Sequence, residues 1–305
     1  MGVESDLIWF DGEMVPFEAA TVHVLSHTLH YGLGVFEGIR SYTQPDGKAG
    51  IWRLDDHLER FIDSMRMMGL VCPFTHEELA EACLRTLEEN HLTEAYLRPL
   101  AFLGMGSMGL GARDNKLHVV IAAWSWGAYL GSEGMDKGVR LKVSSFVRQH
   151  PNAALQRAKV VGHYVNSILA RYEANEDGFD EALMLDHHGY VAEGTGENVF
   201  VIKHGEIMTP PVLNILPGIT RSTVLEILRH EGYNAAEQFF ARDAFYVADE
   251  AFMCGTAAEI TPIRELDHRV VGKGTPGPIT RRVQELYLSG VKGEVDWLRK
   301  HITSR

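Results

Sequence analysis

Turn chemistry in the first fifty residues most constrains how this chain can fold. Leu7–Phe10 and Glu13–Pro16 are typical of strands and are separated by an Asp-Gly pair. Val35–Thr43 and Ile51–Leu54 flank the turn sequence Pro45-Asp46-Gly47 in the same way. Turns of this composition join antiparallel strands. The N-terminal part of the chain is therefore predicted to be built of β-hairpins.

Helices and short strands follow without strict alternation. Apolar residues at helical spacing from Leu58 to Met65 predict a half-buried helix, and Thr75 begins a capping box for a helix over 77–90. Residues 162–175 carry an apolar helical stripe of Val165, Ile168, Leu169 and Tyr172. The remaining strands and helices are expected at 95–103, 117–123, 139–147, 181–185, 190–192, 198–202, 206–209, 219–230 and 279–288. Hairpins mixed with helices favour an α+β fold over a doubly wound parallel sheet.

The length of 305 residues suits two domains. Residues 125–138 contain aromatic side chains among several glycines and show no clear periodicity, which is typical of a connecting loop. We therefore predict a small N-terminal domain over 1–124, an interdomain loop over 125–138 and a large C-terminal domain over 139–305.

Composition excludes several partners. The 41 acidic and 29 basic residues give a net charge of −12, which argues against nucleic acid or an anionic membrane as the main partner. No apolar run is long enough to span a membrane, and the N-terminus lacks the basic start of a secretory signal. The three cysteines show no CxxC spacing, which argues against a disulfide framework. A cytoplasmic protein with no membrane partner is expected.

Two patterns point to other chemistries but lack the required context. Residues 104–109 read GMGSMG, which matches GxGxxG, yet a dinucleotide site needs a helix after the turn and a strand follows here. The chain has 15 histidines, but no HExxH pair occurs, and His187-His188 precedes a turn glycine. We predict neither an NAD site nor a metal site.

Lys159 is the first residue that suggests a reaction. It lies among alanine and valine residues, and a lysine in such surroundings is poorly hydrated as a cation, which favours a nucleophilic amine. A lysine reaching solvent from a strand end fits the same pattern. Tyr164 either offers its hydroxyl to a polar ligand or packs as an ordinary aromatic residue. Glu193 stands among glycines, where a flat ligand can approach the backbone, or it is a solvated turn residue.

Two segments are candidates for binding an anion. Leu216–Arg221 opens a predicted helix, where free N–H groups and the helix dipole favour a phosphate. Residues 254–259, CGTAAE, offer the hydroxyl of Thr256 in a possible backbone nest. Arg60 is predicted on the helix face opposite the apolar stripe, where it is either solvated or directed at the same anion. A lysine, an acid and a phosphate cup together suit pyridoxal 5′-phosphate (PLP).

With these parts, the chain resembles the branched-chain amino-acid aminotransferases of the fold-type IV PLP enzymes. The resemblance covers nearly the whole chain and implies two α/β domains with the cofactor at the domain interface. The matching motifs, in the family's order and spacing, are His30-Tyr31-Gly32, Val35–Arg40, Tyr96–Pro99, Lys159, Glu193–Asn198, Leu216–Arg221 and Gly255–Pro262.

The resemblance implies a role for each cofactor residue. Lys159 would form the Schiff base with PLP and then move the proton of the substrate Cα. Glu193 would pair with the pyridine nitrogen, and Tyr164 would hydrogen-bond the phenolic oxygen. The residues expected to hold the phosphate are Arg60, Ile219, Thr220 and Thr256, with Asn198 as a further cofactor-binding candidate.

A substrate site is implied as well, because a branched aliphatic side chain needs an apolar, aromatic lining. The residues expected around the substrate side chain and carboxylate are Phe36, Tyr96, Trp126, Tyr129, Tyr164, Thr256 and Ala257. Arg98 would bind the second carboxylate of glutamate, and Gly38 would allow close backbone approach. Tyr31 and the loop 105–108 would come from the partner subunit of a homodimer, the minimal unit of a possible larger oligomer.

The implied reaction transfers the amino group of L-leucine, L-isoleucine or L-valine to 2-oxoglutarate, giving 2-oxo acids and L-glutamate. D-amino-acid aminotransferases, (R)-selective amine transaminases and aminodeoxychorismate lyases share the fold, but Tyr96-x-Arg98 and Gly255–Ala258 favour the branched-chain enzyme. Two other classes are distinguishable by assay. A dehydrogenase would turn over reduced nicotinamide, and a cofactor carrier would show the chromophore without amino transfer.

Overall fold

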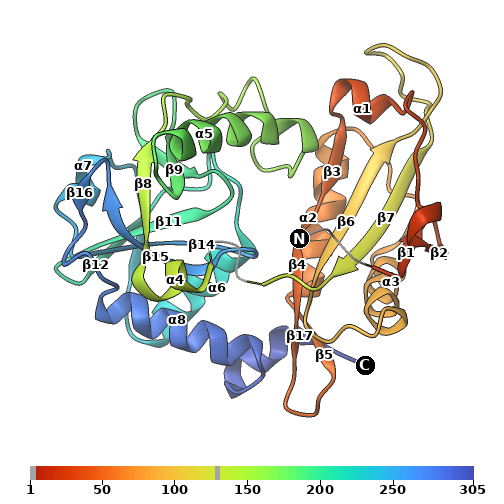
Figure 1. Ribbon diagram of the computed structural model, residues 1–305. Helices are drawn as coiled ribbons and strands as arrows, with labels where there is room; N and C mark the ends of the chain where they lie inside the picture. The colour runs from red at the N-terminus through yellow and green to blue at the C-terminus, as the bar shows by residue number, and fades with distance from the viewer. Residues whose placement is uncertain (1–4, 128–130) are drawn as a thin grey trace. The chain divides into compact units, whose positions relative to one another are not determined.

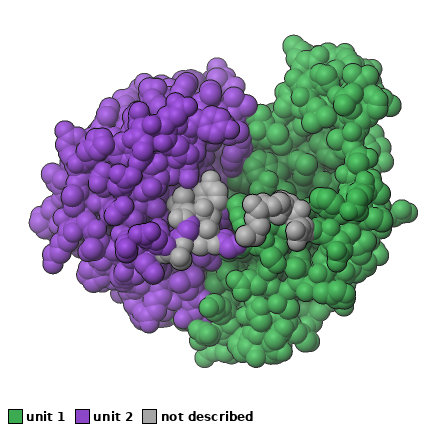
Figure 2. Space-filling model, in the orientation of Figure 1, with its two compact units in different colours: residues 1–126, 158–163, 290–305 green, residues 127–157, 164–289 purple. Residues whose placement is uncertain are grey.

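The computed structural model describes residues 5–127 and 131–305, and the chain divides into two compact units (Figure 2). Unit 1 comprises residues 1–126, 158–163 and 290–305, and unit 2 comprises 127–157 and 164–289. The segment around Lys159 therefore belongs to unit 1, although it follows the first residues of unit 2 in sequence. The domain boundaries at 124 and 139 stay a prediction.

Unit 1 contains an eight-stranded sheet in the described part of the chain, with the order β17-β5-β4-β6-β7-β1-β2 and with β3 beside β6 (Figure 1). Its elements are β1 (Leu7–Phe10), β2 (Glu13–Pro16), α1 (His27–Tyr31), β3 (Gly34–Phe36), β4 (Ile39–Thr43), β5 (Ala49–Trp52), α2 (Leu54–Met67), α3 (His76–Glu89), β6 (Ala95–Leu103), β7 (Leu117–Trp124) and β17 (Ile302–Thr303), with 3-10 turns at Phe17–Ala19, Val161–His163 and Asp296–His301.

The first predicted hairpin is confirmed, and the second contains a break. In the first, Phe10 pairs with Glu13 across a two-residue turn. The strand predicted over 35–43 instead forms β3 and β4, which both pair with β6. Opposite the break lies Pro99, which has no N–H to give to the ladder. The N–H of Glu37 still donates to the Pro99 carbonyl at 2.8 Å, so this glutamate remains fixed inside the sheet.

Helices α2 and α3 bury their apolar faces in one core with the unit 1 sheet. Leu58, Phe61 and Met65 of α2 are fully buried, as their helical spacing predicts. The capping box of α3 is present, with Glu78 N–H donating to Thr75 Oγ1 and Thr75 N–H donating to the Glu78 carboxylate. The hydrophobic pattern therefore fixes which face of α2 points away from solvent.

Unit 2 contains a nine-stranded sheet in its described residues, with the order β10-β9-β8-β15-β14-β11-β12-β13 and with β16 beside β15 (Figure 1). Its elements are α4 (Gly131–Lys137), β8 (Val139–Val143), α5 (Tyr164–Glu176), β9 (Glu181–Leu185), β10 (Val191–Gly194), β11 (Asn198–Lys203), β12 (Glu206–Thr209), α6 (Ile219–His230), β13 (Ala235–Glu237), α7 (Asp243–Tyr246), β14 (Glu250–Gly255), β15 (Glu259–Leu266), β16 (Arg269–Val270) and α8 (Pro278–Val291), whose last residues belong to unit 1. Mixed sheets with helices confirm the α+β prediction.

Two features of unit 2 differ from expectation. Part of the loop predicted over 125–138 is the helix α4, which glycines at 131 and 134 concealed. The apolar stripe of α5 faces outward, with Val165 and Tyr172 about 60% exposed. The helix instead buries Ser167, Ala170 and Ala174, because small residues let its backbone approach β9 closely.

Candidate active site

The predicted site residues form two groups, one on each compact unit. Lys159 belongs to the group on unit 1, and two hydrogen bonds hold its backbone. Its N–H donates to Ser64 Oγ of α2 at 3.1 Å, and its carbonyl accepts from the Phe36 N–H of β3 at 3.1 Å. The neighbours Ala158 and Val160 are buried, and the Lys159 Nζ lies 5.0 Å from the centre of the Phe36 ring. The amine therefore projects from a fixed apolar segment.

Arg60 of α2 forms a buried ion pair that sequence analysis missed. Its Nε and Nη2 lie 2.7 Å and 2.9 Å from the two carboxylate oxygens of Glu37, which is fully buried. Nδ1 of His57 lies 2.7 Å from the same carboxylate, and the Gly38 N–H donates to it at 3.2 Å. Of the two alternatives for Arg60, the structure contradicts the solvated one, because its guanidinium pairs with the buried Glu37 and its side chain is only 11% exposed.

Charge interactions decide the ionisation of this cluster. Burial opposes ionisation of Glu37, but the charge of Arg60 and the hydrogen bonds from His57 and Arg60 outweigh it and hold the pKa of Glu37 well below its usual value. Burial lowers the pKa of His57, against the attraction of Glu37. The stable arrangement is a glutamate anion paired with a guanidinium and a neutral imidazole that carries its proton on Nδ1.

Arg98 is enclosed by aromatic side chains of unit 1. Its guanidinium carbon lies 4.8 Å from the ring centre of Phe36 and 5.3 Å from that of Tyr96, and Nη2 donates to the Tyr96 hydroxyl at 3.3 Å. The ring of Trp126 contacts Tyr96 edge-on at 4.6 Å. The buried Nε of Arg98 has no hydrogen-bond partner among the described residues. Such an orphaned donor suits an incoming carboxylate.

The hydroxyl group of Tyr96 lies against Gly38, one of the two residues between β3 and β4. A Cβ atom on Gly38 would collide with the Tyr96 hydroxyl, so only glycine leaves room for it.

The residues expected to reach the partner subunit are exposed. Tyr31 lies at the end of α1 and is 44% exposed, and Met105 and Met108 of the loop are 60% and 44% exposed. Predicted Tyr129 lies outside the described residues.

Glu193 is the centre of the group on unit 2. It lies in β10 and is 3% exposed. Arg148 Nη2 lies 2.9 Å from its Oε1, while Oε2 accepts from Asn198 Nδ2 and from the Leu216 N–H, each at 3.2 Å. Asn198 also donates to the Leu216 carbonyl at 3.1 Å. Glu193 is thus fixed beside the loop that leads into α6, and it is not a solvated turn residue.

The N-terminus of α6 offers an anion site. The helix begins at Ile219, its cap residue Gly218 provides no side-chain hydrogen bond, and Thr220 is 3% exposed. A Cβ on Gly218 would collide with Asn198 Oδ1, so glycine lets this loop lie against the amide. Free N–H groups and the dipole of a helix start attract phosphate. Thr256 and Ala257 follow β14 in a turn, and half-buried Tyr164 begins α5.

Glu37, His57, Ser64 and Arg148 are the site neighbours that sequence reasoning missed. Glu37 stands inside a matching motif, and a charged residue within an apolar strand pattern is a signal that could have marked it. The spacing of His57, Arg60 and Ser64 at i, i+3 and i+7 places them on one helix face, but that face looked polar and solvated. Arg148 gave no local signal.

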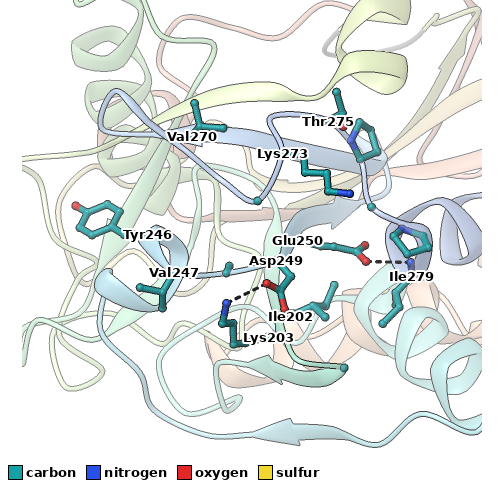
Figure 3. A pocket seen from close by; sticks show the side chains of 16 residues that line it. Ile202, Lys203, Tyr246, Val247, Asp249, Glu250, Val270, Lys273, Thr275 and Ile279 are labelled. Carbon is teal, nitrogen blue, oxygen red and sulfur yellow. Dashed lines mark hydrogen bonds and ion pairs between the residues drawn. The ribbon is translucent and has the colours of Figure 1, made fainter.

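A separate cavity of about 870 Å³ opens on unit 2, and none of the described candidate residues lines it (Figure 3). Three of its charged groups serve the fold: Lys203 Nζ pairs with Asp249 at 2.9 Å, and Glu250 accepts from the N–H groups of Ile279 and Thr280 at the start of α8. Within the described part of the chain, no group of three acidic, histidine or cysteine residues could hold a metal ion. No described helix is long and apolar enough to cross a membrane.

The residues present fit PLP. An uncapped helix start with buried Thr220 suits its phosphate, and a fixed acid at Glu193 suits its ring nitrogen. A lysine with an anchored backbone suits its aldehyde. These features are structural properties of the two units and do not depend on the motif matches.

Comparison with known proteins places these features in a family. Residues 34–266 match the profile of the amino-transferase class IV family. A branched-chain-amino-acid aminotransferase of Pseudomonas aeruginosa is 50% identical over 296 residues, covering 97% of this chain and 96% of that protein. The crystal structure of a T.th. branched-chain amino acid aminotransferase with pyridoxamine 5′-phosphate has a TM-score of 0.96 and 44% identity, with 99% of both chains covered. Its complex with N-(5′-phosphopyridoxyl)-L-glutamate has a TM-score of 0.95 and 42% identity, again with 99% of both chains covered.

Proposed function

The chain belongs to the amino-transferase class IV family, as a branched-chain-amino-acid aminotransferase, and from that premise we propose how its residues perform the reaction. The enzyme transfers the amino group of L-leucine, L-isoleucine or L-valine to 2-oxoglutarate and releases branched-chain 2-oxo acids and L-glutamate. Its cofactor is PLP, which supplies an electron sink for the pair released when the Cα–H bond of the amino acid breaks.

Lys159 is the catalytic residue of this proposal. Its Nζ would hold the cofactor in the resting enzyme, and the amine that is freed when the amino group of the substrate takes its place would be the base for the Cα proton. The backbone bonds to Ser64 and Phe36 support this role, because they fix the start of a long flexible side chain. A base that is positioned in advance loses little freedom on reaction.

The other cofactor residues bind and orient. Glu193 would keep the pyridine nitrogen of the cofactor protonated, and Tyr164 would donate to its phenolic oxygen. The phosphate ligands are Arg60, Ile219, Thr220 and Thr256, with Asn198 holding the loop between Glu193 and α6. The hydrogen bonds of Asn198 to Glu193 and Leu216 support that last role.

Arg98 distinguishes the two substrates. Its aromatic enclosure and orphaned Nε support a site for the second carboxylate of 2-oxoglutarate. Phe36, Trp126 and Tyr129 contact the aliphatic side chain of the other substrate, and Gly38 allows close backbone approach. Residues proposed for the carboxylate common to both substrates are Tyr96, Thr256 and Ala257.

The proposed minimal unit is a homodimer in the cytoplasm. Tyr31 and the loop 105–108 would be supplied to the partner subunit. The exposure of Tyr31, Met105 and Met108 supports this assignment, because it leaves these side chains accessible to a partner subunit. The three cysteines are all free thiols, which supports a reducing location.

The observation that carries the proposal is the anchored Lys159, and absorption spectroscopy tests it. The purified protein with PLP is expected to show a visible band that bleaches when L-leucine is added without an oxo acid, and that returns with 2-oxoglutarate. A band that ignores leucine but bleaches with a D-amino acid or an amine would transfer the substrate assignment to a relative of the same fold. Absence of any band would overturn the Lys159 assignment.

A further inference from the structure

Glu37 is a buried anion that the roles above leave unexplained. It has no exposed surface, and its two carboxylate oxygens accept from Nε and Nη2 of Arg60 in the two-pronged geometry that fixes a guanidinium plane. His57 and the Gly38 N–H occupy the same carboxylate. Glu37 lies in the gap between β3 and β4, opposite Pro99, and its side chain is fully buried. The geometry therefore determines how Arg60 is oriented.

One face of α2 links this pair to the catalytic lysine. His57, Arg60 and Ser64 follow one another on that face, and Ser64 Oγ accepts the Lys159 backbone N–H at 3.1 Å. From the other side, Phe36, the residue before Glu37, donates its N–H to the Lys159 carbonyl. The same two elements thus hold both Lys159 and the Glu37–Arg60 pair.

Stability alone does not account for a pair of this kind. Taking a carboxylate and a guanidinium out of water is costly, and well-packed apolar residues often serve a core as well or better. The side chain of Arg60 is 11% exposed and that of Glu37 is not exposed, so both charges have lost most of their hydration. A charge pair in this place is explained if its geometry serves a ligand.

We propose that Glu37 is a positioning residue that orients the Arg60 guanidinium for the phosphate of the cofactor. This inference rests on the proposed function, in which Arg60 is a phosphate ligand. Glu37 does not touch the cofactor in this proposal. It fixes the plane of the Arg60 guanidinium. Because α2 and β3 also hold the backbone of Lys159, it fixes the position of that guanidinium relative to Lys159 as well.

The test compares two ligands that differ only in the phosphate. Full-length protein is titrated with PLP and with pyridoxal, and the dissociation constants are taken from the visible band. Glu37→Gln keeps the shape of the side chain and removes its charge. We expect it to weaken PLP binding by roughly tenfold, the value of one charged hydrogen bond, and to leave pyridoxal binding unchanged. In an Arg60→Lys background, which cannot form the two-pronged contact, Glu37→Gln should add less than about twofold.

The controls separate positioning from folding. Glu250→Gln removes another buried carboxylate, one that accepts N–H groups at the start of α8, and should lower the melting temperature without changing PLP affinity. Unchanged PLP affinity in Glu37→Gln, equal weakening of PLP and pyridoxal, or additive losses with Arg60→Lys would overturn the inference. Glu37→Asp keeps the test informative if Glu37→Gln does not fold, because the shorter side chain keeps the charge but loses the two-pronged contact and must then weaken PLP more than pyridoxal. If the wild-type protein fails to bind PLP, the proposed function falls first.

Discussion

Two buried glutamates, one on each unit, have pKa values that are shifted in opposite directions from the usual value. Glu37 of unit 1 meets Arg60 and His57 at hydrogen-bond distance, and its pKa is held well below the usual value. Burial raises the pKa of Glu197 on unit 2, and the charge of Glu193 adds to this rise, although the Gly196 N–H and the charges of Arg171 and Arg148 oppose it. Because both side chains are buried, burial alone does not decide ionisation. The partners of Glu37 outweigh the effect of burial on its pKa, and those of Glu197 do not.

The difference extends to what each unit offers a ligand. Unit 1 presents the amine of Lys159, the guanidinium groups of Arg60 and Arg98, and the buried carboxylate of Glu37. Unit 2 presents carboxylates near a glycine loop and a helix start. Cationic groups suit phosphate and substrate carboxylates, whereas an acid beside a ring nitrogen keeps that nitrogen protonated. In the proposed function, the reacting amine therefore belongs to unit 1 and the ring acid to unit 2.

The largest expected effect tests the reacting amine. Lys159→Ala should lower kcat by roughly 10⁴-fold, the upper range for loss of a positioned base, because no other amine shares its anchored backbone position. Single-turnover measurements with L-leucine check this. Lys203→Ala, which removes a lysine paired with Asp249 at 2.9 Å, is the matched control and should keep the wild-type rate. Wild-type turnover of the Lys159→Ala enzyme would show that Lys159 does not supply the reacting amine.

The second prediction concerns the fixed anion of unit 1. Arg60→Met leaves the Glu37 carboxylate buried without its guanidinium and should lower the free energy of unfolding by about 3–5 kcal/mol. Urea unfolding of the cofactor-free protein measures this loss. Arg60→Met combined with Glu37→Leu removes both charges and should recover most of the stability. Equal losses in the single and double variants would show that packing, not charge pairing, holds this cluster.

The third prediction separates the two half-reactions. Arg98→Leu should lower kcat/KM for 2-oxoglutarate roughly 10- to 100-fold more than for L-leucine, because only 2-oxoglutarate loses a charged contact. The two half-reactions can be followed separately by the bleaching and recovery of the cofactor band. Phe36→Leu, which changes the apolar lining but no charge, is the control and should affect leucine at least as much. Equal losses in both half-reactions for Arg98→Leu would contradict its role.

Local patterns predicted the fold well where one segment determines its own structure. The turn at Asp11-Gly12, the capping box at Thr75 and the helix Ile219–His230 all appear as expected. Each is set by residues within a few positions of one another, so spacing alone is informative. The helix α4 escaped prediction because its glycines are poor helix formers that only the surrounding structure overrides.

Long-range contacts were the part that the sequence did not reveal. Arg60 looked solvated because its true partner, Glu37, lies 23 positions away on another element. The outward stripe of α5 and the Arg148–Glu193 pair depend in the same way on how distant segments pack. The roles of Lys159 and Glu193 came from a resemblance to whole motifs, which carry long-range information that single residues do not.

The smallest expected effect is a difference in the pH dependence of stability, which tests the contrast between Glu37 and Glu197 directly. The pKa of Glu197 is raised by folding, so its protonation contributes stability that is present below its ordinary value of 4.5 and is lost as the pH rises toward the folded pKa. Glu197→Gln should remove this loss and raise the unfolding free energy above pH 4.5, by less than the Arg60→Met variant loses. Urea unfolding of cofactor-free protein between about pH 3 and pH 7 measures the profile.

Glu37→Gln should give the opposite profile in the same experiment. The pKa of Glu37 is lowered by folding, so its ionised form contributes stability that is present above 4.5 and is lost as the pH falls below that value. The Gln variant should therefore be less stable than wild type near neutral pH and should lose less stability in acid. Both variants remove one buried carboxyl group of equal size. Profiles of the same sign would mean that burial, and not the nearest charged partner, governs these two glutamates.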